Sequence, residues 1–149
     1  MEKITLYNKE FSLSEIDYIA IKKEKGIIPK YSICISYDTQ NIVVPETETT
    51  DELKIARVLQ SVKEKFSGIG HFVSIYRSSP LINIYRAKNL ELKKCAFNNR
   101  NYLEITLHNG SVFSTKPEDL NSGAGYNDWQ YHYDYYKQMC KTQERHKER

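Results

Sequence analysis

The strongest structural signal in this chain is the stretch YSICISYDTQNIVV, residues 31–44. Its first half alternates apolar and polar residues with period two, so one face of an extended strand would carry four aligned side chains: Tyr31, Ile33, Ile35 and Tyr37. The polar run at 38–41 predicts a turn, and the apolar run at 42–44 predicts a return strand. Because one face is apolar and the other largely polar, the stretch predicts an antiparallel hairpin with one face on the core.

A second stretch follows the same plan. Residues 102–107 alternate as YLEITL, His108-Asn109-Gly110 predicts a turn, and Val112-Phe113 predicts the return strand. Asn109-Gly110 favours a type I′ turn, because both residues tolerate positive φ. Each hairpin precedes an expected helix, so the chain reads as two β-β-α-like repeats. The halves share pattern more than identity, which leaves an internal duplication and an ordinary meander both open.

Two helices are expected, at about 50–66 and about 127–142. In the first, Thr49 and Glu52 have the spacing of a capping box, and apolar residues recur at helical spacing: Ile55, Leu59, Val62 and Phe66. The second carries an aromatic stripe: Tyr126, Trp129, Tyr133 and Tyr136. With further strand patterns along the chain, this predicts an α+β fold, a mostly antiparallel sheet of about seven or eight strands covered by two helices. We expect one domain over residues 1–140 and a charged, flexible tail over 141–149.

Composition limits the class of protein. The chain has 149 residues, 40% of them apolar and 28% charged, which is typical of a globular domain that needs no metal or disulfide. No run approaches the roughly 20 apolar residues that span a bilayer, and the first ten residues lack the apolar stretch of a secretion signal. We therefore expect a cytoplasmic protein with no membrane contact. The three cysteines (Cys34, Cys95 and Cys140) have no zinc-binding spacing and are expected to be free thiols.

The leading functional hypothesis is a small, non-catalytic, tyrosine-rich protein that binds another protein. The chain has 12 tyrosines, and Tyr and Trp are the residues most enriched at interface hot spots. Tyr131 and Tyr135 lie off the aromatic stripe of the second helix, so with His132 and Trp129 they form the predicted protein-binding patch. The simpler interpretation is a terminal helix packed on the sheet. Oligomeric state is left open, and a homodimer is compatible with the pattern.

Abundant Lys, Ile, Asn and Tyr fit an AT-rich coding sequence, which is compatible with a phage or another mobile element. An inhibitor or accessory factor with an anti-defence role, for example an inhibitor of a host defence nuclease, is one concrete form of the hypothesis.

The first alternative is a nucleic-acid-binding module that uses the sheet face or the basic C-terminal segment, with Lys137, Lys141, Arg145 and Lys147 as phosphate contacts. The net charge of +3 is modest and partly resides in the tail, which argues against a strong basic footprint. Single-stranded bases could still stack on the neighbouring tyrosines.

The second alternative is a metal-dependent nuclease. Glu91-Leu92-Lys93 has the E-x-K spacing that such enzymes use on a strand, but residues 78–90 supply no upstream carboxylate, leaving only distant Asp17 or Asp38. Nor do the histidines have the neighbours of a general base: His71 and His108 stand near no nucleophile in sequence. Asp128, His132 and Asp134 are better explained by a surface ion pair. The sequence therefore predicts no catalytic residue, no metal site and no cofactor.

Overall fold

The computed structural model describes residues 2–69, 71–74, 80–94, 96–97, 101–114, 134 and 138. The chain divides into two compact units, Met1–Asn83 and Ile84–Arg149, and each is considered by itself. Among the described residues, no helix is long and apolar enough to cross a membrane.

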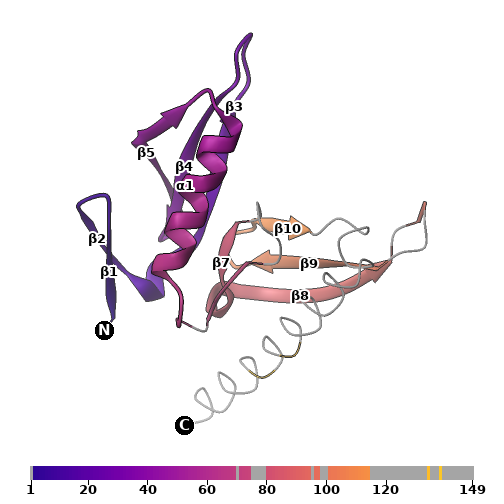
Figure 1. Cartoon of the computed structure of the whole chain (residues 1–149). Coiled ribbons are helices and arrows are strands. Elements are labelled where there is room, and N and C mark those ends of the chain that lie inside the picture. Colours follow the sequence, from indigo (N-terminus) through magenta and orange to yellow (C-terminus); the bar gives the residue numbers. More distant parts are fainter. Residues whose placement is uncertain are drawn as a thin grey trace. The chain divides into compact units, whose positions relative to one another are not determined.

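The first unit is an antiparallel sheet covered on one face by a helix (Figure 1). Along the chain its elements are β1 (Lys3–Leu6), β2 (Lys9–Ser12), the 3₁₀ turn η1 (Leu13–Glu15), β3 (Ile16–Glu24), β4 (Lys30–Tyr37), β5 (Gln40–Thr49), α1 (Glu52–Lys65), β6 (Phe72–Val73) and β7 (Leu81–Asn83). Five strands form the sheet in the order β5-β4-β3-β7-β6, and β1 and β2 form a separate hairpin.

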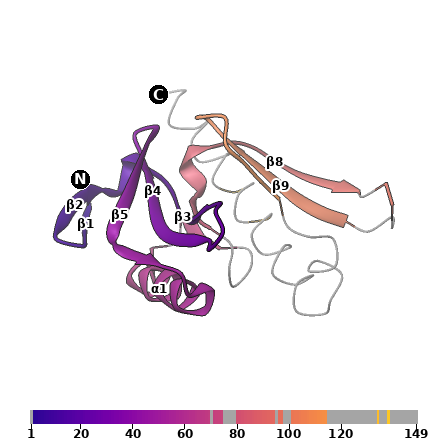
Figure 2. The same ribbon diagram turned by 90° about the horizontal axis from the view of Figure 1, so that it is seen from above.

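The core lies between α1 and the apolar face of the sheet. In Figure 2, α1 runs along one side of β3, β4 and β5. The helix buries Ile55, Leu59 and Val62, and Ile33 and Ile35 of β4 belong to the same buried cluster. The face predicted from the alternation in β4 is therefore confirmed as a core face.

Helix α1 begins two residues later than the capping box predicts. Asp51 is the N-cap, because its Oδ1 accepts hydrogen bonds from the N–H groups of Leu53 (3.0 Å) and Lys54 (3.2 Å). The hydroxyl of Thr49 instead accepts from the N–H of Asp51 at 3.1 Å. Asp51 therefore takes the N-cap position that the predicted box assigns to Thr49, and its carboxylate satisfies the first helical N–H groups.

The second unit contains a three-stranded antiparallel sheet. Its described elements are η2 (Ile84–Arg86), β8 (Ala87–Lys94), β9 (Asn101–Leu107) and β10 (Val112–Ser114), in the sheet order β10-β9-β8. Among the described side chains of this unit, Leu90, Ile105 and Leu107 are fully buried.

The hairpin predicted at Asn109-Gly110 is present, but its turn type is not the predicted one. Gly110 alone has a positive φ of 92°, and its N–H donates to the carbonyl of Leu107 at 3.0 Å. A three-residue loop ending in a left-handed glycine therefore replaces the type I′ turn. Two-residue turns with both residues at positive φ occur instead at Tyr7-Asn8 and Asp38-Thr39, without glycine.

The α+β class with mostly antiparallel sheets is confirmed, but the layout differs from the prediction. The described residues hold ten strands in three sheets, not seven or eight in one, because β1 and β2 pair only with each other and β8, β9 and β10 form a sheet of their own. They contain one α-helix, α1. The helix expected at 127–142 lies outside the described residues apart from Asp134 and Gln138, and so does the tail at 141–149.

The two units share an internal plan. Each has a 3₁₀ turn followed by a three-stranded meander, and the first strand of each meander shifts register between its first and third residues, Ile16/Tyr18 in β3 and Ala87/Asn89 in β8. In each, the residue after the second strand donates its N–H to the last residue of the 3₁₀ turn: Asp38 to Glu15 at 2.8 Å, and His108 to Arg86 at 3.0 Å. A bulge and a hydrogen bond at equivalent places favour an internal duplication over two unrelated meanders.

Because of Lys63, in the last turn of α1, the free energy of unfolding should depend on pH in the alkaline range. Burial lowers the pKa of its ammonium from 10.5 to about 8. Between these values the unfolded chain holds a proton that the folded chain has lost, so the free energy of unfolding rises as pH rises. We expect Lys63→Met to raise stability near pH 7 and to flatten this rise, as measured by urea denaturation near pH 7 and pH 10. Lys65→Met, at an exposed position of the same turn, is the control and should retain the rise.

Candidate functional site

Most residues of the predicted binding surfaces lie outside the described part of the chain. These are the aromatic patch, Trp129, Tyr131, His132 and Tyr135, and the basic set, Lys137, Lys141, Arg145 and Lys147. Both sets stay predictions.

The E-x-K pair of β8 forms a cross-strand ion-pair cluster. The Nζ atom of Lys93 lies 3.7 Å from Glu91 Oε2 and 2.8 Å from Glu104 Oε1, and Glu104 is directly opposite Glu91 in β9. Asn89 Nδ2 donates to Glu91 Oε1 at 2.6 Å. The hydrogen bond to Glu104 raises the pKa of the Lys93 ammonium. The Lys93 ammonium thus offsets the repulsion between two carboxylates that face each other across the strands.

Sequence reasoning missed Glu104 because it sought the carboxylate upstream of Glu91. The alternation of YLEITL and the hairpin pairing would have indicated it. Distant Asp17 serves another purpose: its buried Oδ2 accepts from the hydroxyl of Ser36 and the N–H of Thr39, both at 3.0 Å, and so fixes the β4–β5 turn. Within the described ranges, no group of three or more His, Cys, Asp or Glu side chains could hold a metal ion.

The two histidines considered as bases lie in different surroundings. His71 precedes β6 and its ring lies 4.8 Å from that of Phe72. Burial lowers the pKa of His71, and the Glu2 carboxylate acts in the opposite direction. His108 is exposed at the β9–β10 turn, where its backbone N–H donates a hydrogen bond to the carbonyl of Arg86.

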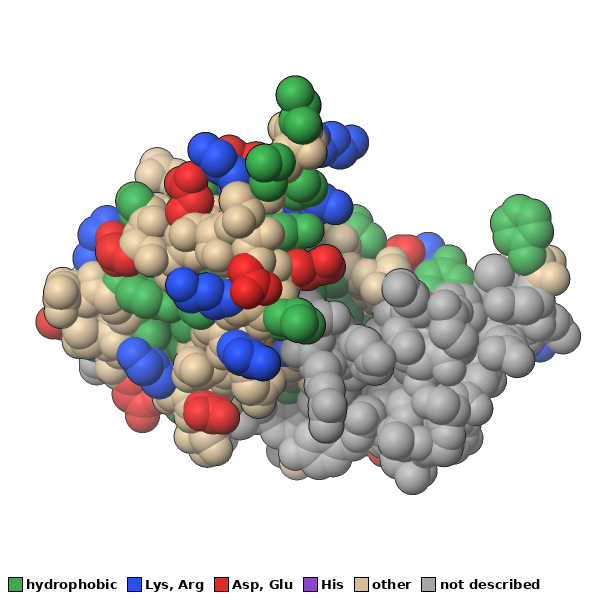
Figure 3. Space-filling model, turned by 45° about the horizontal axis from the view of Figure 1, so that its top comes forward, with side chains coloured by type: hydrophobic (Ala, Val, Ile, Leu, Met, Phe, Trp, Pro, Cys, Tyr) green, Lys and Arg blue, Asp and Glu red, His purple; other side chains and the backbone are tan. Residues whose placement is uncertain are grey.

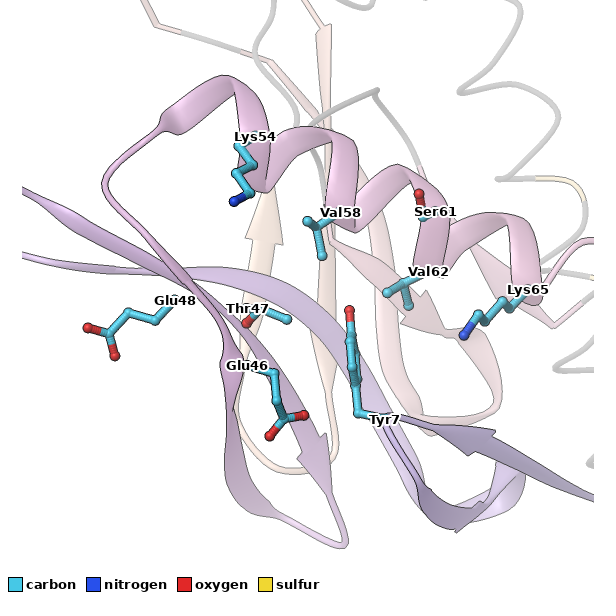
Figure 4. A pocket seen from close by; sticks show the side chains of 9 residues that line it. All are labelled: Tyr7, Glu46, Thr47, Glu48, Lys54, Val58, Ser61, Val62 and Lys65. Carbon is cyan, nitrogen blue, oxygen red and sulfur yellow. The ribbon is translucent and has the colours of Figure 1, made fainter.

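A groove of about 240 Å³ lies beside the edge strand β5, between α1 and the β1–β2 turn (Figure 4). Beside the groove β5 bulges: Tyr31 pairs with Thr49, but Ile33 pairs with Val44. The buried hydroxyl of Thr47 stabilises the bulge, since it accepts from the N–H of Ile33 at 2.8 Å and donates to the carbonyl of Val44 at 2.7 Å.

Tyr7 projects its phenol into this groove, toward the helix (Figure 4). Its φ of 51° is unusual for a bulky residue. Burial, and to a smaller extent the Glu46 carboxylate, raise the pKa of the phenol.

The charges around the groove are balanced. Glu46 and Glu48 come from β5, while Lys54 and Lys65 come from α1. The groove is also smaller than the roughly 300–1,000 Å³ of typical ligand pockets. With two carboxylates and two ammonium groups in its lining, the groove favours neither an anionic nor a cationic ligand.

The clearest exposed apolar feature of the first unit is the apex of the β3–β4 hairpin. We call residues 25–29, Lys-Gly-Ile-Ile-Pro, the β3–β4 tip. Backbone pairing continues up to Glu24 opposite Lys30, and the hairpin extends beyond the end of α1 (Figure 1). Ile27 and Ile28 have relative exposures of 105% and 66%. Two adjacent β-branched apolar side chains thus stand in water at the end of an ordered ribbon.

Lysines surround this apex. Lys22, Lys23, Lys25 and Lys30 are all exposed. Lys22 lies 3.8 Å from Glu24, Lys30 lies 3.5 Å from Glu48, and Lys23 lies 6.0 Å above the Tyr31 ring. Figure 3 shows hydrophobic side chains standing clear of the surface at the top of the view, with Lys or Arg side chains beside them.

Between β8 and β9 the structure describes two residues, Ala96 and Phe97. Phe97, between Lys94 and Asn101, has a relative exposure of 100%. Two lysines, Lys93 and Lys94, end β8 just before it. The sequence patterns indicate neither segment as a binding surface, because each has only the features of a break between strands.

Comparison with known proteins gives no match to a family model, to a curated protein or to a solved structure.

The Thr47 bridge can be tested without changing side-chain shape. Thr47→Val removes both hydrogen bonds of the buried hydroxyl and leaves the N–H of Ile33 without its partner. We expect the free energy of unfolding to fall by about 1–3 kcal/mol in urea denaturation. Thr49→Val is the control, because its hydroxyl bond is exposed, and should cost less than about 0.5 kcal/mol. Equal losses would contradict the role of the Thr47 bridge.

Proposed function

We propose that the chain is a non-catalytic protein-binding protein that contacts its partner through the β3–β4 tip. The observation that carries this proposal is the exposure of Ile27 and Ile28 at the apex of an ordered hairpin. Burying each side chain in a partner would contribute about 1.5–3 kcal/mol. That is the size of an interface hot spot.

The surroundings of the tip resemble the anatomy of a protein interface. An apolar centre with a polar, charged rim is the usual arrangement. Here the rim holds four lysines, together with Glu24 and Glu48, which pair with Lys22 and Lys30. The ribbon is held by backbone pairing up to Glu24 and Lys30, so little conformational entropy is lost on binding. The expected partner surface is an apolar pocket bordered by carboxylates.

The aromatic segment belongs to the same proposal as a second contact surface. Tyr131 and Tyr135, with Trp129 and His132, supply the ring-bearing side chains that interfaces favour. In its narrower form, the proposal is a cytoplasmic inhibitor or accessory factor encoded by a mobile element. The support for that form is the composition of the chain, with its 12 tyrosines.

The apolar side chains of the tip can be substituted without changing the core. In the double variant Ile27→Ser/Ile28→Ser, we expect an unchanged melting temperature, because both side chains are exposed. Partner affinity should fall at least about 30-fold, given the area removed. The measurement is copurification from an extract of the encoding organism, followed by titration of the recovered partner.

Leu53→Ser provides the matched control, since Leu53 is 71% exposed on α1 and lies outside the tip. Loss of the partner in the tip variant and its retention in Leu53→Ser would support the proposal. Undiminished binding by the tip variant would refute it.

The lysines of the ribbon favour one second candidate, nucleic-acid binding. A two-stranded β-ribbon fits the major groove of DNA, and Lys22, Lys23 and Lys25 could contact phosphates. If this is correct, gel shifts with duplex probes weaken steeply with salt, and the triple Lys→Gln variant loses them while Ile27→Ser/Ile28→Ser keeps them. Absence of any shift at micromolar protein and low salt ends this candidate.

A further inference from the structure

We propose that the groove between α1 and β5 binds a small zwitterion, whose ammonium and carboxylate lie at opposite ends of an apolar frame, as in a dipeptide with free termini. None of the residues that line the groove belongs to the β3–β4 tip. The site would therefore be additional to the protein contact of the proposed function, and it does not rest on that function.

The first support is that the two walls of the groove carry opposite charges. Glu46 and Glu48 lie on the strand side, and Lys54 and Lys65 lie on the helix side (Figure 4). A ligand with a single charge would be attracted by one wall and repelled by the other, whereas a ligand with one charge of each sign is attracted by both. The separation of the charges between the walls therefore favours a zwitterion.

Glu46 and Lys65 are the charged pair available to such a ligand. Glu48 already forms an ion pair with Lys30 at 3.5 Å, and its carboxylate points away from Tyr7 in Figure 4. Within the described part of the chain, Glu46 and Lys65 have no ion-pair partner. Figure 4 shows their side chains on opposite sides of the Tyr7 ring. Glu46 would bind the ammonium of the ligand and Lys65 its carboxylate.

The second support is the conformation of Tyr7. The β1–β2 turn holds Tyr7 and Asn8 at φ values of 51° and 63°, which asparagine tolerates but a bulky aromatic residue rarely adopts. The ring packs against the core, and its hydroxyl end reaches into the groove toward α1 (Figure 4). No described residue forms a hydrogen bond with this hydroxyl. An unfavourable backbone conformation that places an unpaired polar group in a groove indicates a role in binding.

The groove also offers an apolar surface and a hydrogen-bond donor. Val58 and Val62 line it from α1 and would contact the apolar frame of the ligand. Because burial raises the pKa of the Tyr7 phenol, the hydroxyl stays protonated at neutral pH and can donate to an oxygen of the ligand. The volume of about 240 Å³ is below that of pockets for drug-sized ligands, which restricts the ligand to a short one.

Titration of the isotope-labelled, full-length chain, followed by NMR, tests this proposal. The probes are alanyl-leucine with free termini and two matched derivatives: the N-acetyl form, which lacks the ammonium, and the C-terminal amide, which lacks the carboxylate. We expect the free dipeptide to cause saturable chemical-shift changes at the backbone amides of Tyr7, Glu46, Val62 and Lys65. Each derivative should bind at least about tenfold more weakly, because each loses one charge-assisted hydrogen bond.

Substitutions assign the two ends of the ligand. Glu46→Gln should weaken binding of the free dipeptide but not of the N-acetyl form, and Lys65→Gln should weaken binding of the free dipeptide but not of the amide. Tyr7→Phe should weaken binding of all three compounds at least about threefold. Glu52→Gln and Arg57→Gln, at exposed positions of α1 outside the groove, are the controls and should leave binding unchanged.

Equal affinity for the free dipeptide and for either derivative would overturn the proposal, since a site for a zwitterion uses both charges. Shift changes confined to residues outside the groove would overturn it as well, and so would the absence of saturable changes at millimolar dipeptide. Because the β3–β4 tip takes no part in this binding, the proposed function would stand in each of these cases.

Discussion

The packing of α1 on the isoleucine face of β3 and β4 is the constraint on which the first unit depends. Ile19, Ile33 and Ile35 are almost completely inaccessible, as are Ile55 and Leu59 of the helix. An isolated two-stranded ribbon is marginally stable in water. The β3–β4 hairpin can therefore extend past the helix as an ordered projection only because its base is held in this core. The exposed apex and the buried face are two ends of the same pair of strands.

Polar side chains then fix the geometry that apolar burial leaves undetermined. Hydrophobic contact is non-directional. Asp17, by contrast, fixes the β4–β5 turn and Thr47 fixes the bulge of β5, through buried or partly buried hydrogen bonds of 2.8 to 3.0 Å. Asn83 acts similarly for β7, since its side-chain amide donates to the carbonyls of Leu13 and Ile16 at 3.3 and 2.9 Å. These groups make the register unique, because leaving any one of them buried and unpaired would be costly.

The sequence predicts this structure well where periodicity is strong. Alternation locates β4 and β9, and helical spacing locates α1, because these patterns report which face is buried. Prediction fails where a tertiary partner determines the outcome. The turn at Asp38-Thr39 adopts positive φ without glycine because Asp17 holds it, and Glu104 is missed because strand register decides its neighbour. The exposed apolar residues at the β3–β4 tip are not predicted for a different reason. Ile27 and Ile28 lie between Gly26 and Pro29, and a pattern with Gly and Pro indicates a turn but not whether its apolar residues are exposed.

The bulge in β5 has a consequence for how this protein behaves at high concentration. β5 is an edge strand, and an edge strand with regular, unpaired backbone groups invites a second molecule to add its own strand. Here Pro45 removes one donor, the bulge interrupts the ladder, and Glu46 and Glu48 bring negative charge to the same segment. These features oppose edge-to-edge growth into fibres. The chain can therefore expose apolar side chains at the β3–β4 tip while the edge strand β5 resists pairing with a second copy.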